Sequence, residues 1–350
     1  MEITEKAFGR KNNQTITLYT LKNDQGFQVS CIDYGCIITE ITAPDRNEEL
    51  ENVVLGFDTF EEYESNPHYF GAVVGRFAGR IKEGAFAIDG TDYQVAKNAN
   101  GHHLHGGPQG FHSAIWNSKV IQSENEAIVE FTHFSPDGEE GFPGNLSMTV
   151  RYTLKNGSNQ LSISYSGKSD KMTLLNVTNH SYFNLSGNFK RTVLDHELTM
   201  KSDHYLELDE ELLPTGALVS VDEDPLFDFR NGRSIRESTV SEHLQTKLAG
   251  HGYDHPFSLN QKEQPAIELH DAESGRKLRI QTTEPAVVLY TGNQIGGPYS
   301  IRGVEAQNHL GLCLETQGMP DSVNHPHFPS AILNAEEEFK SETVYSFSFE

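Results

Sequence analysis

The sequence predicts an all-β fold, a large antiparallel β-sandwich, and three observations lead to this prediction. Short segments with alternating apolar and polar residues recur along the chain, as half-buried antiparallel strands require. Turn-forming pairs such as Asp89-Gly90 and Asp137-Gly138 separate these segments. Only two stretches, 59–65 and 234–248, have a pattern compatible with a helix.

The alternating segments divide their side chains between two faces. In the first, Phe27, Val29 and Cys31 alternate with polar neighbours, and the same pattern returns in four later segments. The five segments are 27–32, 127–132, 146–154, 161–166 and 344–349. No repeat of fixed length occurs, which disfavours a propeller or a solenoid. No linker or change of composition divides the chain, so we expect residues 1–350 to form a single domain.

Composition excludes several classes of protein. The chain has 350 residues, of which 36% are apolar, and it contains no apolar run long enough to cross a membrane. Its first residues lack a basic start followed by an apolar stretch, so we expect no signal peptide. Its three cysteines, Cys31, Cys36 and Cys313, form neither an even set nor a CxxC motif. We therefore expect reduced thiols and a cytoplasmic protein.

The charge balance limits the partners of the chain. Fifty acidic residues against 27 basic ones give a formal net charge of −23. Such a charge repels phosphate backbones and anionic lipids, so we expect neither nucleic-acid nor membrane partners. Solubility is the ordinary explanation for this acidity. We expect a small-molecule substrate and a monomer or weak homodimer.

The stretch NVTNHSYFNLSG, residues 176–187, is the first of five polar clusters. It combines many uncharged hydrogen-bonding groups with aromatic rings, which suits a small neutral ligand rich in hydroxyls. His180 lies at its centre, and Asn179, Ser181 and Asn184 are candidates to fix the tautomer of its ring, as a proton-transferring histidine needs. The alternative is a structural histidine whose hydrogen bonds are satisfied.

The second and third clusters contribute arginines and histidines. If the strand of residues 71–74 continues, Arg76 and Arg80 share one face, where an arginine can bind adjacent hydroxyls or a carboxylate. A solvated arginine or a structural ion pair is the alternative. In Asn100-Gly-His-His-Leu-His-Gly-Gly, His103 and His105 can share a strand face and suggest a metal site. No carboxylate follows as a third ligand, so we expect no metal; His105 beside two glycines is then a pocket residue or an ordinary loop residue.

The last two clusters contribute carboxylates. Asp254, in Gly-Tyr-Asp-His-Pro-Phe, is either a turn-forming residue or an acceptor for vicinal sugar hydroxyls. Glu315 directly follows the apolar run Leu312-Cys-Leu at an apparent strand end. A carboxylate buried there needs partners or a raised pKa, which makes it a candidate general base. A structural salt bridge is the alternative.

Together these groups form an acid/base site for a neutral polyhydroxylated molecule. Interconversion of sugar anomers needs a base at the C1 hydroxyl and an acid at the ring oxygen, so that the ring opens, rotates and recloses. An ionised glutamate and a histidine can supply both, and no metal or redox cofactor is required. This scheme requires folding to bring Glu315 and His180 to opposite sides of one pyranose.

The chain resembles the aldose 1-epimerase (galactose mutarotase) family in six segments, which occur in the family's order: GRFAGRI, HLHGG, NVTNHSYFNLSG, GYDHPF, LYTGN and LETQGMPDSVNHPHFP. They run from Gly75 to Pro329, so the resemblance covers essentially the whole chain. It implies a large antiparallel β-sandwich, the galactose mutarotase-like supersandwich, and interconversion of the anomers of free hexoses such as glucose or galactose.

Carried over by position, the resemblance implies a role for each residue. Glu315 is the base on the C1 hydroxyl and His180 the acid on the ring oxygen. His105 assists at the ring oxygen, and Arg80 and Asp254 bind sugar hydroxyls.

Two positions depart from the family. Relatives often carry Asn where this chain has Gly79, and a hydrogen-bonding Gln where it has Val288. Both changes leave the acid/base pair intact but leave the preferred sugar open.

Four other functions compete with this interpretation. A glycoside hydrolase would pair Glu315 with Asp254 and leave both histidines without a role. A sugar-binding module would not need Glu315 with His180. A hexose-6-phosphate epimerase would need a basic phosphate pocket, for which Arg76 and Arg80 are the obvious candidates. A cupin-like metalloenzyme would hold a metal at the histidines.

Overall fold

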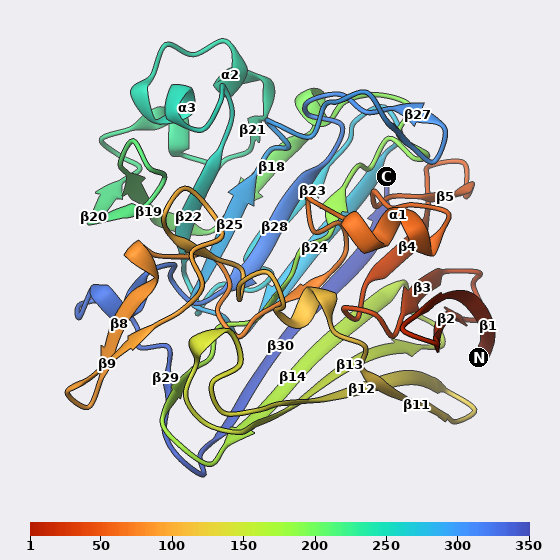
Figure 1. Cartoon of the computed structure of the whole chain (residues 1–350). Helices are drawn as coiled ribbons and strands as arrows, with labels where there is room; N and C mark the ends of the chain where they lie inside the picture. Colours follow the sequence, from red (N-terminus) through yellow and green to blue (C-terminus); the bar gives the residue numbers. More distant parts are fainter.

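The computed structural model describes all 350 residues and consists mainly of antiparallel β-sheet, which confirms the predicted fold class (Figure 1). Three sheets of nine, six and five strands form the body of the molecule. The strands of the nine-stranded sheet, in sheet order, are β11 (Asn117–Gln122), β12 (Glu126–Ser135), β13 (Leu146–Lys155), β14 (Gln160–Ser169), β30 (Glu338–Phe349), β24 (Arg276–Thr282), β23 (Ile267–His270), β18 (Glu197–Met200) and β21 (Arg233–Ser234).

The other two large sheets contain shorter strands. The six-stranded sheet has the order β17 (Tyr182–Phe183), β28 (Leu312–Gln317), β25 (Ala286–Tyr290), β22 (Asp254–Leu259), β19 (Ser202–Leu208) and β20 (Pro214–Ser220). The five-stranded sheet follows chain order: β1 (Glu2–Lys11), β2 (Gln14–Lys22), β3 (Gln28–Ile32), β4 (Ile38–Pro44) and β5 (Leu50–Asn52).

Five small antiparallel pairs complete the β-structure. They are β6 (Val73–Val74) with β16 (Thr178–Asn179), β7 (Arg80–Ile81) with β10 (His103–Leu104), β8 (Ala85–Ile88) with β9 (Thr91–Gln94), β15 (Thr173–Leu174) with β29 (Ile332–Leu333), and β26 (Ser300–Ile301) with β27 (Val304–Glu305). All five alternating segments predicted from the sequence lie in strands of the large sheets, namely β3, β12, β13, β14 and β30.

The helices are few and short. The prediction at 59–65 is confirmed by α1 (Phe60–Ser65). The prediction of one helix at 234–248 is wrong, because that segment forms two separate turns, α2 (Arg236–Thr239) and α3 (Leu244–Leu248). Side chains of the segment compete with the helix for backbone groups: Thr239 Oγ1 donates to a carbonyl of α2, and His243 Nδ1 accepts from the first turn of α3. None of the helices is long or apolar enough to span a membrane.

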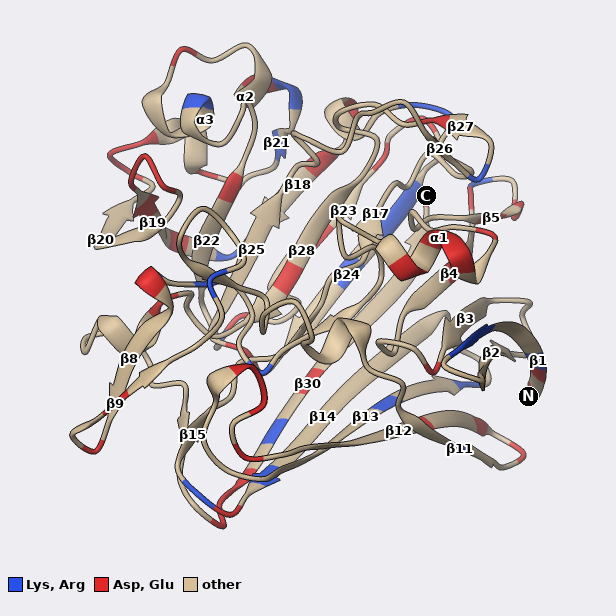
Figure 2. Cartoon of the chain, viewed as in Figure 1, with Lys and Arg blue, Asp and Glu red and all other residues tan.

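One hydrophobic cluster of 52 buried residues draws side chains from all three large sheets. A second cluster of 17 residues packs around α1 and β17, and it includes Phe70, Tyr182 and Cys313. The acidic residues are spread over loops and strand ends in many parts of the molecule, with basic residues among them (Figure 2).

Candidate active site

A cavity of about 190 Å³ lies against one face of the six-stranded sheet, over β22, β25 and β28. It is small beside the roughly 300–1,000 Å³ pockets that hold drug-sized ligands, and so it suits a compact molecule. Loops from distant parts of the chain form its walls, and they contribute Tyr69, His105, Leu212 and Gln294.

The strand register places the floor residues of this cavity. Asp254 of β22 lies opposite Tyr290 of β25, and Val288 of β25 lies opposite Glu315 of β28. Residues two apart on a strand share a face, so Cys313 lies on the same face of β28 as Glu315. Glu315 is 3% exposed and its Oε2 atom has no hydrogen-bond partner, so the carboxylate is held at the cavity with one oxygen free.

His180 lies between β16 and β17, and its backbone fixes its position. The His180 amide donates to the carbonyl of Ala72, and its carbonyl accepts from the amide of Gly71. The imidazole Nε2 lies 3.5 Å from Glu315 Oε1, and both side chains are at least 95% buried. The fold therefore brings the two residues into one cavity, but side by side and not on opposite sides of a ring-sized space.

The polar neighbours of His180 do not orient its ring, so that part of the sequence prediction is wrong. Asn179 Nδ2 donates to the carbonyl of Gly71, and Asn184 Nδ2 donates to two other backbone carbonyls. The Ser181 hydroxyl has no hydrogen-bond partner. The two asparagines satisfy backbone groups, because a buried irregular segment lacks the ladder bonds that a strand supplies. The ring nitrogen that they leave free, Nδ1, contacts Cys313 instead.

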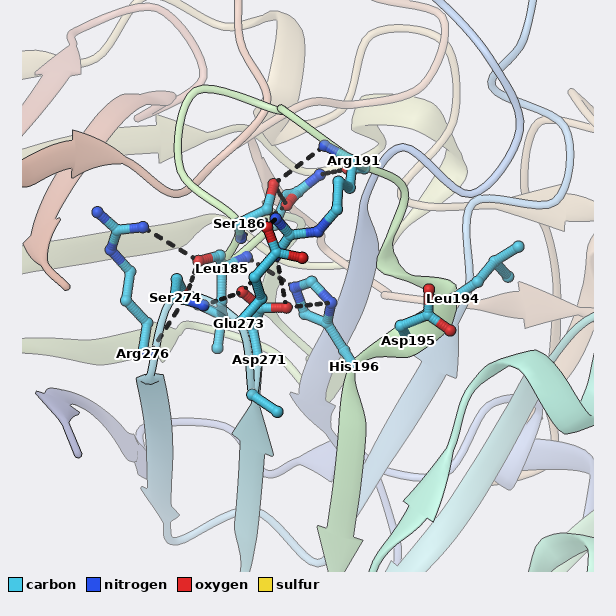
Figure 3. A network of polar contacts seen from close by, with 12 residues as sticks. Leu185, Ser186, Arg191, Leu194, Asp195, His196, Asp271, Glu273, Ser274 and Arg276 are labelled. Atoms are coloured by element: carbon cyan, nitrogen blue, oxygen red, sulfur yellow. Dashed lines mark hydrogen bonds and ion pairs between the residues drawn. The ribbon is translucent and has the colours of Figure 1, made fainter. Parts of the chain in front are cut away.

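A polar network anchors the end of the same segment (Figure 3). The Leu185 amide donates to His196 Nε2 at 2.9 Å, and the Leu185 carbonyl accepts from Ser274 Oγ at 2.8 Å. Arg191 donates to both carboxylate oxygens of Asp271 at 3.0 and 2.8 Å. Burial lowers the pKa of His196 to about 4, so its ring is neutral and Nε2 can accept this bond.

His105 is held in one protonation state by its backbone neighbour. The amide of Gly79 donates to His105 Nδ1 at 3.1 Å, and the amide of His105 donates to the carbonyl of Gly79. A backbone amide can only donate, so Nδ1 must carry a lone pair and the ring proton must lie on Nε2. Gly106 makes this geometry possible, because it has a φ of +84° and a Cβ there would lie 1.7 Å from the carbonyl oxygen of Gly75.

Of the two predicted arginines, only Arg80 reaches the cavity. Its Nη1 lies 3.9 Å from Asp254 Oδ2, and both side chains are about one-fifth exposed. Arg76 is 2% exposed and binds Ser135 and the carbonyl of Pro143, away from the cavity. The prediction that both share a strand face is wrong, because β6 ends at Val74 and the chain turns before β7 begins at Arg80.

His103 and His105 also part, although they are two residues apart. His103 Nδ1 contacts the carbonyl oxygen of Ala96 and its ring packs on Phe142, while His105, with a φ of +51°, turns into the cavity.

The third metal-ligating group that the sequence lacked near His105 is supplied by the fold, since His105, His180 and Glu315 place potential ligand atoms within 4.8 Å of one another. A metal at His105 Nε2 would require its proton to move to Nδ1, against the Gly79 amide. The donor set therefore fits a hydroxylated ligand better than a metal.

Burial shifts the acid/base pair toward its uncharged forms. Burial, and then the charge of Asp254, raise the pKa of Glu315 well above its ordinary value, while Arg80 lowers it by less. Burial is also the largest cause that lowers the pKa of His180. The pair can hold one transferable proton in two ways: as a neutral glutamic acid beside a neutral imidazole, or as a carboxylate beside an imidazolium. It can therefore exchange between these forms without taking up a proton from solvent or losing one to it.

Two residues that contact the cavity histidines, Tyr69 and Cys313, were not among the predicted site residues. Tyr69 packs edge-on against His105, with ring centroids 4.9 Å apart, and forms part of the wall. Cys313 contacts His180 from β28. The only sequence signal for Cys313 is its position two residues before Glu315, on the same strand face. For Tyr69, the sequence offers only its position shortly before the apolar residues 71–74 that precede Arg80.

Comparison with known proteins gives consistent results. The sequence profile of the family described as Aldose 1-epimerase matches residues 17–346. A galactose mutarotase of Bos taurus is 41% identical over 337 residues, covering 95% of this chain and 94% of its own length. An aldose 1-epimerase of Escherichia coli (strain K12) is 36% identical over 342 residues, covering 96% of both chains. The crystal structure of galactose 1-epimerase from Lactobacillus acidophilus NCFM superposes with a TM-score of 0.88 at 31% identity, covering 99% of both chains.

Proposed function

The chain belongs to the aldose 1-epimerase family and interconverts the anomers of sugars, and we propose that Glu315 and His180 carry out this reaction on free hexoses such as glucose and galactose. The observation that carries the proposal is the contact of 3.5 Å between Glu315 Oε1 and His180 Nε2 in one small cavity. The two oxygens that exchange protons, O1 and O5, are both bonded to C1 of the sugar. An acid and a base that serve them must therefore lie side by side.

The reaction begins with the pair as carboxylate and imidazolium. Glu315 takes the proton of the C1 hydroxyl while His180 Nε2 donates its proton to the ring oxygen. The electron pair of the O1–H bond forms the carbonyl at C1, and the C1–O5 bond breaks with its electrons on O5. The products are an open-chain aldehyde, a neutral Glu315 and a neutral His180, so the pair still holds one proton.

Ring closure reverses these transfers on the other face of the aldehyde. After rotation about the C1–C2 bond, the C5 hydroxyl attacks C1 and returns its proton to His180. Glu315 returns its proton to the former carbonyl oxygen, which becomes the C1 hydroxyl of the other anomer. Burial destabilises both charges, so it raises the free energy of the carboxylate–imidazolium form relative to the neutral form.

The remaining cavity residues bind and orient the sugar. His105 presents a fixed Nε2–H donor, which suits the ring oxygen as negative charge develops there. Arg80 and Asp254 lie beside each other and offer donors and acceptors to adjacent hydroxyls. Gly79 and Val288 offer no side-chain hydrogen bonds at positions where relatives often have them. A cavity with fewer directional contacts should tolerate several hexoses.

Polarimetry on freshly dissolved sugars tests the function. We expect the enzyme to accelerate the approach of both α-glucose and α-galactose to anomeric equilibrium. We expect much weaker acceleration with their 6-phosphates, because Arg80 is the only lysine or arginine that lines the cavity and it is already beside Asp254. Faster reaction with the 6-phosphates would favour a sugar-phosphate epimerase, and release of a chromogenic aglycone would favour a glycoside hydrolase.

The pH dependence tests the shared proton. We expect a bell-shaped profile for kcat/KM, because the pair is inactive when it gains a second proton or loses its only one. Burial lowers the pKa of His180 and raises that of Glu315, so it moves the two limbs apart. The acid limb should therefore lie below about pH 6.5, the ordinary imidazole value. Subtraction of the buffer-catalysed rate is the control, and an acid limb at or above pH 6.5 would contradict the proposal.

We also propose that the enzyme acts in the cytoplasm as a monomer or weak homodimer. Its three cysteines are free and buried, which suits a reducing compartment. Its exposed large apolar residues are few, and apart from the neighbours Val240 and Leu244 they lie far apart in the sequence: Leu50, Ile121, Phe134, Leu218, Val240, Leu244 and Phe349. Such scattered residues are normal on a monomer and do not imply a large permanent interface.

A further inference from the structure

The two cavity histidines differ in what contacts their Nδ1 atoms. His105 Nδ1 faces the amide of Gly79, which can only donate. His180 Nδ1 faces the thiol of Cys313, with 3.5 Å between sulfur and nitrogen. Cys313 is fully buried, and 133 residues separate it from His180 in the sequence.

A thiol at His180 Nδ1 can act as either a hydrogen-bond donor or an acceptor. Its S–H group donates a weak hydrogen bond, and its sulfur accepts one, depending on how the group rotates. In the neutral His180 that remains after Nε2 has given up its proton, the ring proton lies on Nδ1, so the sulfur accepts from Nδ1–H and Nε2 presents its lone pair toward Glu315. Toward the imidazolium, the sulfur accepts from Nδ1–H. An amide at this place would exclude the imidazolium, as Gly79 does at His105.

We propose that Cys313 is a positioning residue for the reaction: its thiol keeps Nε2 of His180 directed at Glu315 and serves both protonation states of the ring. The inference rests on the proposed roles of His180 and Glu315. Cys313 does not contact the reacting atoms, and it acts through His180. Strand β28 therefore holds both the base, Glu315, and the partner that orients the acid.

The surroundings of the ring support this role. Tyr182, paired with Cys313 in the sheet, packs near the imidazole at a centroid distance of 5.2 Å. Tyr69 lies 5.8 Å and His105 5.2 Å from it, again between ring centroids. None of these contacts is a hydrogen bond to Nδ1, so the thiol is the side chain that contacts this atom.

Burial and neighbouring groups shift the pKa values of both Cys313 and His180. Burial raises the pKa of Cys313, first, and the charge of Glu315 raises it further, so the group remains a thiol at neutral pH. The nearby phenol of Tyr182 opposes this shift by a smaller amount. Besides burial, His68 and His112 lower the pKa of His180, whereas its own backbone carbonyl raises it by offering a second acceptor.

Two substitutions test the role, with a third as a matched control. In Cys313→Ala, Nδ1–H loses the side chain that accepts from it in both the imidazolium and the neutral ring, so Nε2 is held less firmly toward Glu315 and the sugar. We expect kcat to fall about tenfold, KM to change little, and the acid limb of the pH profile to move to lower pH, because the imidazolium loses an acceptor at Nδ1. Cys313→Ser keeps a group that donates and accepts, and it should retain most of the activity and the original acid limb.

Cys31→Ala is the matched control, because Cys31 is equally buried but lies in β3, in the main core. It should leave kcat and the pH profile unchanged, and thermal unfolding of each variant reports any loss of stability. An unchanged profile in Cys313→Ala, or equal loss in the Ala and Ser variants, would overturn the inference. If the Glu315→Gln variant is inactive in the same assay, the proposed function stands even when this inference fails.

Discussion

Replacement of Glu315 by Gln is expected to lower kcat for anomer interconversion by about a thousandfold, within the range that general-base catalysis supplies. Gln has nearly the same shape but cannot accept the proton of the C1 hydroxyl. KM should change little, because the amide keeps an oxygen at the same place. Polarimetry with α-galactose and α-glucose measures the effect after subtraction of the uncatalysed rate.

Stability measurements separate this loss from misfolding. Burial raises the pKa of Glu315, so its protonated form favours folding. That contribution is present below the unfolded pKa of about 4.3 and is lost as the pH rises through the folded pKa. At pH 8 the ionisation of Glu315 in the unfolded chain therefore makes the folded wild type less stable relative to a variant with a neutral Gln. Tm of Glu315→Gln at pH 8 should equal or exceed that of the wild type, and near-full activity of this variant would show that the base is a different group.

Replacement of His180 by Asn should have an effect of similar size, a loss of several hundredfold to a thousandfold in kcat. The side-chain amide keeps a hydrogen-bond donor near the ring oxygen but cannot transfer a proton to it. Because acid and base act on the same C1 atom in one step, the double variant with Glu315→Gln should be scarcely slower than either single variant. Fully additive losses in the double variant would contradict the shared mechanism.

A matched histidine variant controls for general effects of the His→Asn change. His204 lies in β19, is exposed and does not line the cavity. His204→Asn should retain wild-type activity and Tm. If His204→Asn loses activity as His180→Asn does, the loss in His180→Asn cannot be attributed to removal of the catalytic acid.

The strands were predictable because their cause is local. Period-two alternation within β13 and β14 reflects which face of each strand meets the core, and that pattern is readable from neighbouring residues alone. The prediction of one helix at 234–248 was wrong for an equally local reason. Side chains that bond to the backbone divide the segment into α2 and α3. The spacing of apolar residues, on which the prediction was based, does not reveal such side chains.

From residue patterns alone, the candidate site was predictable only as a set of residue types. Family motifs pointed to Glu315, His180, His105, Arg80 and Asp254, and the fold places all five in one cavity. Local patterns without those motifs could not separate Arg80 from Arg76, or His105 from His103, because these neighbours differ only in the loop conformation that follows from long-range packing.

By itself, the sequence determined the fold class, the strand segments and the family, because each depends on patterns within short stretches of chain. Only the tertiary structure decided that Glu315 and His180 lie 3.5 Å apart, and that an amide contacts one cavity histidine and a thiol the other. Those contacts join residues far apart in the chain, and the packing of β28 against the loop before β17 sets them. The protonation states on which the chemistry depends follow from that packing, because burial and the partner at Nδ1 determine which ring can carry a charge.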